Sequence, residues 1–396
     1  MHYKCKNMHE DIVAMCLYIE NIMSFDYKKA DSQATVVEPM EPGQFPYEAY
    51  ADYEAARHER CRRFKDAPSG VLVYRRMRVQ QCFSSGCRRM DESLRWQLGA
   101  LAKSMEFEAD VPNFLEPWYG IGTLASAYGV DYEWLEGQAP AVSHPFQSVQ
   151  EALAAPVKPV AETAIGRHTL AMIRYFMEQT GGSLPMSLAD TQSPLNAACM
   201  LVDTSSFLLD CIDDPDAVRA FLGRLAELQV EFVRKQQELI GDRLVWPGHG
   251  FASSPVFSGL GQSDDNLLMM SNEMYGELAA PSLCASGAPF GGPVFHSCGN
   301  WSDKLPVITK LPGVRTVDAA FGDATDPNPN PVEPFPAALA GTGIVLNARI
   351  VGEPDRVVGI VRRLWAPGMK LIVVTYCQTP QEQDETYERI HELCHV

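Results

Sequence analysis

From residue 107 onward the chain alternates short apolar runs with longer amphipathic segments, and this alternation limits the folds open to it. Each run ends near Gly, Pro, Asp or Asn, as strands commonly do. Strands that alternate with helices form a parallel sheet. Eight strands are expected, the fourth being the weakest, at residues 111–115, 183–189, 243–246, 256–259, 293–298, 315–320, 343–350 and 370–377.

The segments between and after these strands show a helical spacing of apolar residues. Eight strand–helix units predict an α/β fold closed into a TIM-type (β/α)8 barrel. A doubly wound open sheet is the alternative, and it also places ligands at the carboxyl ends of the strands. The expected helices lie at residues 168–178, 216–239, 266–278, 354–364 and 381–393.

The N-terminal part lacks this alternation of strands and helices. Residues 1 to about 100 lack strong strand signals, whereas 47–64 and 91–107 space their apolar residues in a helical rhythm. Prolines and a glycine within residues 31–46 indicate a loop between helices. We therefore expect a helical N-terminal extension over residues 1–64, followed by the barrel domain over residues 65–396.

Composition and charge exclude several classes of protein. A hydrophobic content of 46% and a charged content of 21% are typical of a globular protein with a substantial core. A formal net charge of -17 argues against nucleic acid as a partner, because such binding depends on Lys and Arg. Acidic residues interrupt the N-terminal stretch, so neither a signal peptide nor a membrane span is expected. We expect a cytoplasmic protein with no membrane or nucleic-acid partner.

His296 and Cys298 stand two residues apart at the end of an expected strand, and Cys377 ends another. Side chains two apart on a strand share a face, so His296 and Cys298 point the same way. One imidazole and two thiolates leave a fourth zinc position open, as in catalytic sites. The alternative is that all three are ordinary buried residues. Their placement at strand ends favours a catalytic Zn²⁺ site.

The order His-x-Cys-Gly-Asn followed much later by Cys resembles the zinc-binding pattern of the methylcobamide:coenzyme M methyltransferases, within the uroporphyrinogen decarboxylase superfamily. That resemblance implies a TIM-type barrel with His296, Cys298 and Cys377 as zinc ligands. The Arg-rich signature of the decarboxylases themselves is absent, because Arg75-Arg76-Met77-Arg78 lacks the surrounding pattern. Other stretches that resemble the superfamily lie at residues 112–117, 119–123, 128–129, 184–195 and 261–265.

The resemblance also implies a reaction and a partner. In those methyltransferases a corrinoid-binding protein presents a methylated cobamide, and a zinc-bound thiolate of a small molecule accepts the methyl group. The first hypothesis for this chain is therefore zinc-dependent methyl transfer from a corrinoid protein to a thiol-type acceptor. A second is the reverse use of such a site, in which a methoxylated aromatic compound or a methylamine is demethylated. A decarboxylase-like enzyme and a corrinoid-binding barrel without catalysis are further alternatives.

Several polar and aromatic residues near expected strand ends are secondary candidates. Asp264 and Asp265 are candidates for contact with substrate or partner, and the alternative is that they cap a helix. The remaining candidates for substrate contact are Asp190, Gln192 and Asn347, and those for the mouth of the pocket are Glu116, Trp118, Tyr119 and His249.

Overall fold

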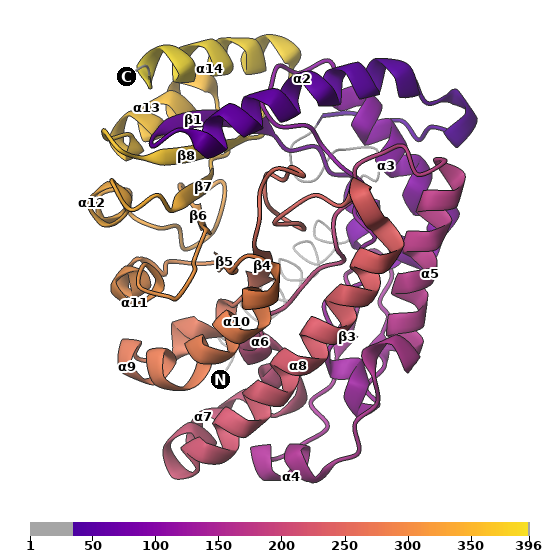
Figure 1. The fold of residues 1–396 in the computed structure, drawn as a ribbon, viewed down its shortest axis with the longest axis vertical. Coiled ribbons are helices and arrows are strands. Elements are labelled where there is room, and N and C mark those ends of the chain that lie inside the picture. Colours follow the sequence, from indigo (N-terminus) through magenta and orange to yellow (C-terminus); the bar gives the residue numbers. More distant parts are fainter. Residues whose placement is uncertain (1–34, 395–396) are drawn as a thin grey trace, which may run out of the picture.

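The structure, a computed structural model, describes residues 35–394 and shows a curved sheet of parallel strands with helices around it (Figure 1). Six strands form one sheet in the order β1-β8-β7-β6-β5-β4, and every pair in it is parallel. Their bounds are Gly70–Arg75 (β1), Leu260–Ser263 (β4), Pro293–His296 (β5), Thr316–Ala320 (β6), Val345–Arg349 (β7) and Lys370–Thr375 (β8).

Short extended segments close the ring between β1 and β4. The Asp110 amide donates to the Val73 carbonyl at 2.7 Å. Further along the ring, Met186 forms parallel bridges with both Leu115 and Leu244, and a third parallel bridge joins the segment after Met186 to the end of β4. The architecture is therefore the expected TIM-type α/β fold, in which part of the ring consists of bridges and not of long strands.

Two strand predictions were wrong. β1 was missed because the strand is largely buried, so its short apolar run lacks the alternation that distinguishes a strand from a buried helix. The strand expected at 256–259 lies instead at β4, after Gly259 with a φ of +102°. Its sequence, Leu-Gly-Gln-Ser, contains no β-branched or aromatic residue and so carries little strand propensity.

Four of the five helices expected after residue 107 are confirmed to within a few residues. The fifth, at 266–278, is broken into a 3-10 turn at Asp265–Met269, the short α9 and a π turn at Tyr275–Ala279. The Ser271 hydroxyl accepts from the Met274 amide and starts α9 anew, so one continuous helix does not form. The helices are Tyr47–Asp66 (α2), Met90–Ser104 (α3), Val149–Ala154 (α4), Ala164–Gln179 (α5), Pro194–Leu201 (α6), Thr204–Asp213 (α7), Pro215–Ile240 (α8), Asn272–Met274 (α9), Ala280–Gly287 (α10), Leu305–Ile308 (α11), Pro334–Leu339 (α12), Pro354–Leu364 (α13) and Pro380–Leu393 (α14).

The strand β8 separates the two parts of the core. Leu371 and Val373 pack outward in one cluster with the helices, whereas Ile372, Val374 and the following Tyr376 belong to the cluster inside the ring. This alternation follows from the period of two along a strand. Odd-numbered residues of this segment therefore face the helices, and even-numbered residues face the lumen.

The described part of the N-terminal region packs onto the barrel. The helices expected at 47–64 and 91–107 are α2 and α3. Phe64, near the end of α2, belongs to the same buried cluster as residues of β1 and β8. The first part of the predicted extension, residues 1–34, lies outside the described residues, and a boundary at residue 64 stays a prediction. No helix within residues 35–394 has the length and apolar character needed to cross a membrane. A small hairpin of β2 (Tyr132–Glu133) and β3 (Ala141–Val142) lies in the loop after α3.

Candidate functional site

A row of polar residues crosses the strands near their carboxyl ends. The register aligns Ser263 of β4 with His296 of β5, His296 with Asp318 of β6, and Asp318 with Asn347 of β7. Loops that follow the strands add further side chains at this end of the ring. Ligand sites of barrel enzymes lie at this end, because the strand-to-helix loops converge there.

Asp265, His296 and Cys298 bring a carboxylate oxygen, a ring nitrogen and a sulfur within 4.8 Å of one another. The Cys298 Sγ lies 3.6 Å from His296 Nε2, and Asp265 Oδ1 lies 3.9 Å from the same nitrogen. The Cys298 amide donates to Asp265 Oδ1 at 2.6 Å and fixes the carboxylate beside the thiol. Three different ligand atoms thus converge from two loops.

The other ring nitrogen of His296, Nδ1, contacts the carboxylate of Asp318. This nitrogen lies 2.7 Å from Asp318 Oδ2, and the same carboxylate accepts from Arg349 Nε at 2.8 Å and from Asn347 Nδ2 at 2.5 Å. Burial alone would raise the pKa of Asp318, but Arg349 and His296 hold that pKa well below its usual value. Asp318 therefore stays ionised and turns the Nε2 of His296 toward Cys298 and Asp265.

This donor set fits zinc. Sulfur, imidazole nitrogen and carboxylate oxygen are its usual ligands, and three protein ligands leave a position for a reactant. A carboxylate on the far nitrogen of a ligand histidine is the support that such sites commonly carry. Burial acts to lower the pKa of His296, but the Asp318 carboxylate holds that pKa well above its usual value, so a metal ion would compete with a proton for Nε2.

Cys377 does not join this cluster. Its side chain is buried, and its Sγ lies 3.5 Å from the Thr386 hydroxyl of α14. The alternation along β8 continues past its end, so Thr375 and Cys377 both face α14, whereas Tyr376 faces the lumen. The predicted ligand set of His296, Cys298 and Cys377 therefore does not match this geometry. Asp265, predicted as a contact for substrate, stands in the third position.

Cys298 differs from the other cysteines in its exposure. Among the nine cysteines within residues 35–394, it alone is exposed, whereas Cys377 is buried and that burial raises its pKa. The loop that follows Cys298 is fixed by Gly299, whose amide donates to Asp326 Oδ2 at 2.9 Å and whose φ is +72°. A residue with a Cβ would be strained in that left-handed conformation.

A second cluster forms around His249, from residues predicted at the mouth together with Asp190, which was predicted to contact substrate. His249 Nδ1 lies 2.6 Å from Glu116 Oε2, and Nε2 lies 3.3 Å from Asp190 Oδ2. Trp118 Nε1 donates to the same Asp190 oxygen at 2.9 Å. Despite full burial, which acts to raise it, the pKa of Glu116 is lowered to about 2 by His249 and by Arg78. Both nitrogens of His249 are thus occupied by carboxylates.

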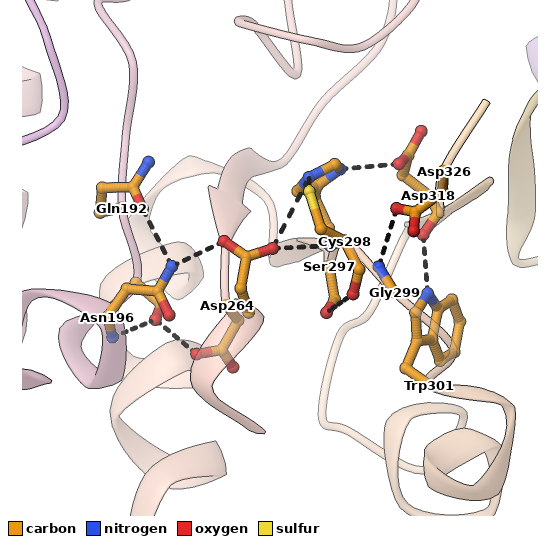
Figure 2. Close-up of polar contacts among 12 residues, drawn as sticks. Gln192, Asn196, Asp264, Ser297, Cys298, Gly299, Trp301, Asp318 and Asp326 are labelled. Atoms are coloured by element: carbon orange, nitrogen blue, oxygen red, sulfur yellow. Dashed lines mark hydrogen bonds and ion pairs between the residues drawn. The ribbon is translucent and has the colours of Figure 1, made fainter. Parts of the chain in front are cut away.

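Amide side chains connect the two clusters. Gln192 Nε2 donates to Asp190 Oδ1 at 2.9 Å, and Gln192 Oε1 accepts from Asn196 Nδ2 at 2.9 Å. The same Asn196 nitrogen lies 3.0 Å from Asp265 Oδ2 (Figure 2). A continuous chain of hydrogen bonds therefore runs from Asp190 to Asp265.

Two predicted residues lie apart from these clusters. Tyr119 stacks on His168 with ring centroids 3.7 Å apart, so it packs beside α5 and not against His249. Asp264 is buried, and it accepts from the Ser193 hydroxyl at 2.5 Å and from Tyr275 at 2.6 Å. Its side chain caps no helix, which excludes that alternative for Asp264. Burial raises its pKa to about 6.

Sequence reasoning missed Asp318 and Asn196 as parts of the site. Asp318 sits within an apolar strand, Thr316–Ala320, and a charged residue in a buried strand is the signal that would have found it. Asn196 lies in the first turn of α6, where an amide is unremarkable in sequence. Arg349 is also part of the site, and its Nη2 is buried without a hydrogen-bond acceptor among the described residues.

Comparisons with known proteins agree with this fold. Residues 74–246, less than half of the chain, match the family model described as uroporphyrinogen decarboxylase (URO-D). The matched stretch includes Glu116 and Asp190 but ends before His296. A solved structure of a methyltransferase from Methanosarcina mazei matches with a TM-score of 0.56 and 14% identity over 93% of this chain and 94% of that one. No curated protein matches the chain. The predicted resemblance to the uroporphyrinogen decarboxylase superfamily is confirmed, and the structural match shows the fold alone.

Proposed function

We propose that this protein is a zinc-dependent methyltransferase that moves a methyl group from a methylated corrinoid protein to a small thiol. The observation that carries the proposal is the convergence of Asp265, His296 and Cys298, with Asp318 behind the imidazole. The similarity to the superfamily and to a solved methyltransferase of the same fold supports it. Zinc and the corrinoid partner are part of this proposal.

The charge of the ligand set favours a thiolate acceptor. One thiolate, one carboxylate and one neutral imidazole balance the two positive charges of zinc, so an anionic fourth ligand remains acceptable. When bound, zinc would lower the pKa of a coordinated thiol, so that the thiolate forms at neutral pH. The role of the chain is to hold this nucleophile in line with the methyl group. The unsatisfied Nη2 of Arg349 provides a donor for a polar group elsewhere on the acceptor.

Metal analysis of paired cysteine variants tests the ligand set. The purified wild type is expected to contain about one zinc per chain, and Cys298→Ala is expected to lose it. Cys377→Ala, the matched control, is expected to retain it, because that sulfur faces α14. Zinc retained by Cys298→Ala, or lost from Cys377→Ala, would overturn the set proposed here.

A spectroscopic assay tests the reaction. Transfer of the methyl group from a methylated corrinoid to a thiol changes the visible spectrum of the corrinoid. The wild type is expected to accelerate this change with a small thiol, and the Cys298→Ala variant is not. Equal rates with and without the protein, for a range of thiols, would contradict the direction of transfer.

The cluster around His249 favours a second candidate, the demethylation of a methoxylated or methylated donor. Such a reaction leaves an alkoxide or amine that needs a proton, and a histidine between two carboxylates is suited to supply it. Incubation with a reduced corrinoid and candidate donors distinguishes the two. Methylation of the corrinoid by a methoxylated aromatic compound would establish this candidate, and its absence with every donor would exclude it.

A further inference from the structure

A cavity lies at the opposite end of the barrel from the candidate site. It has a volume of about 240 Å³ and is lined where β6, β7 and β8 begin. Lys370 starts β8, and Tyr376 follows the end of that strand near the mouth. At a rise of about 3.3 Å per residue, the two ends are roughly 20 Å apart. The cavity is therefore independent of the metal cluster.

Lys370 points into this cavity. It is an even-numbered residue of β8, and such residues face the lumen of the barrel. Its exposed fraction is 7%. The ammonium group has three hydrogens to donate, and one goes to the Lys65 carbonyl at 2.8 Å. Burial lowers its pKa, which is the cost of holding this charge away from water.

Lys370 forms no close ion pair with the protein around it, although the more distant Asp66 carboxylate acts to stabilise its charge. Among residues 35–394, neither Lys370 nor Arg315 on the rim of the cavity forms an ion pair with a carboxylate, and no residue lining the cavity is acidic. This is notable in a chain with a formal net charge of -17. Buried charges are normally paired, so the buried ammonium of Lys370, with the exposed guanidinium of Arg315 at the rim, favours an external anion.

The walls of the cavity are apolar. The rings of Phe64 and Phe257 meet edge to face with centroids 6.4 Å apart, and Lys370 Nζ lies 4.9 Å from the centroid of Phe64. Ile372 and Val345 complete this side. A cavity of about 150 Å³ suffices for benzene, so the volume here accommodates one aromatic ring and a carboxylate.

We propose that this cavity binds a small organic anion, with its carboxylate paired to Lys370 and Arg315 and its apolar body against Phe64 and Phe257. The ligand class is that of an aromatic monocarboxylate. A binding site at this end of the barrel is separate from the methyl transfer proposed above and does not depend on it.

Calorimetric titration of the full-length protein with three probes tests the ligand class. Benzoate is expected to bind saturably, whereas benzamide, which has the same shape without the charge, is expected to bind at least about tenfold more weakly. Inorganic phosphate is expected to be weaker as well, since it has no apolar body. Absence of benzoate binding, or equal binding of benzamide or of phosphate, would overturn the proposal.

Variants test the residues. Lys370→Met preserves the length of the side chain and is expected to weaken benzoate binding at least about tenfold, while Lys235→Met on the exposed face of α8 changes nothing. Should Lys370→Met fail to fold, Arg315→Gln on the exposed rim is expected to weaken binding about threefold or more. Unchanged affinity in a folded Lys370→Met, or in Arg315→Gln where only that variant folds, would refute the assignment. Zinc content is expected to stay the same in all of them.

Discussion

Two histidines at the mouth of the barrel each contact a carboxylate, yet they differ in whether a ring nitrogen remains available to bind a ligand. Asp318 occupies one nitrogen of His296 and leaves the other beside Cys298 and Asp265. His249 has carboxylates at both nitrogens, Glu116 at 2.6 Å and Asp190 at 3.3 Å. A histidine with one free nitrogen is suited to bind a metal ion, and one with both occupied is suited to hold and pass a proton. The predictions below test this distinction.

The largest effect is expected on zinc content. His296→Ala removes a ligand, so zinc should fall from about one per chain to nearly none. His249→Ala is the matched control and should keep its zinc, because neither of its nitrogens is available as a ligand. Metal analysis of the two purified variants checks this. Loss of zinc from the His249 variant alone would reverse the assignment of the two histidines.

The next effect is expected on turnover. His249→Gln cannot supply the proton that the leaving group of a methylated donor needs, and we expect the rate with such a donor to fall about 10²–10⁴-fold. Tyr119→Phe, which keeps its ring on His168, should turn over normally. The pH profile of the rate, measured with zinc content unchanged, checks this. A wild-type rate in His249→Gln would limit that cluster to a structural role.

A smaller effect, on zinc affinity, is expected at Asp318, which contacts the proposed ligand His296. Asp318→Asn keeps the shape of the side chain but removes the charge that orients His296, and zinc should bind about 10–100-fold more weakly. Competition with a chelator of known affinity measures this change. The exposed carboxylate of Asp303 serves as the control, since Asp303→Asn should leave the affinity unchanged. Equal affinities in the two variants would mean that Asp318 does not support the imidazole.

The smallest effect is expected at Asp264 and concerns stability. Its folded pKa of about 6 lies above the ordinary value of 3.8. Its contribution to the stability of the fold is therefore complete below about pH 3.8 and is lost as the pH rises through 6. Above pH 6 the wild type carries a buried anion that Asp264→Asn avoids. The free energy of unfolding of the variant, relative to that of the wild type, should therefore increase by roughly 2–3 kcal/mol between pH 4 and pH 7. Urea titrations in a chelator check this, and a constant difference across that range would contradict it.

The sequence predicted the barrel because eight expected strands and their helices alternate. The last four strand ranges hold in the structure as β5 to β8, whereas the first three contain only isolated bridges. It could not predict which face Cys377 takes, because β8 ends at Thr375 and the phase becomes clear only where Gln383 and Thr386 of α14 receive the side chains. His296 and Cys298 were predictable as a pair, since two residues of spacing place them on one face.

The partners of His249 were beyond the reach of sequence. Glu116, Asp190 and His249 come from three separate loops, and each is ordinary in its own segment. Only closure of the ring through the bridges at Met186 brings these loops together. The proposed zinc ligand Asp265 was predicted as a polar residue near substrate, but its distance from His296 depends on how β4 and β5 pair.

The exposure of Cys298 has a practical consequence. Because every other cysteine within residues 35–394 is wholly or partly shielded, an alkylating reagent added to the native protein should modify this sulfur first. A cation at the same atom would slow that modification. The rate of labelling thus serves as a gauge of occupancy that requires neither partner nor substrate.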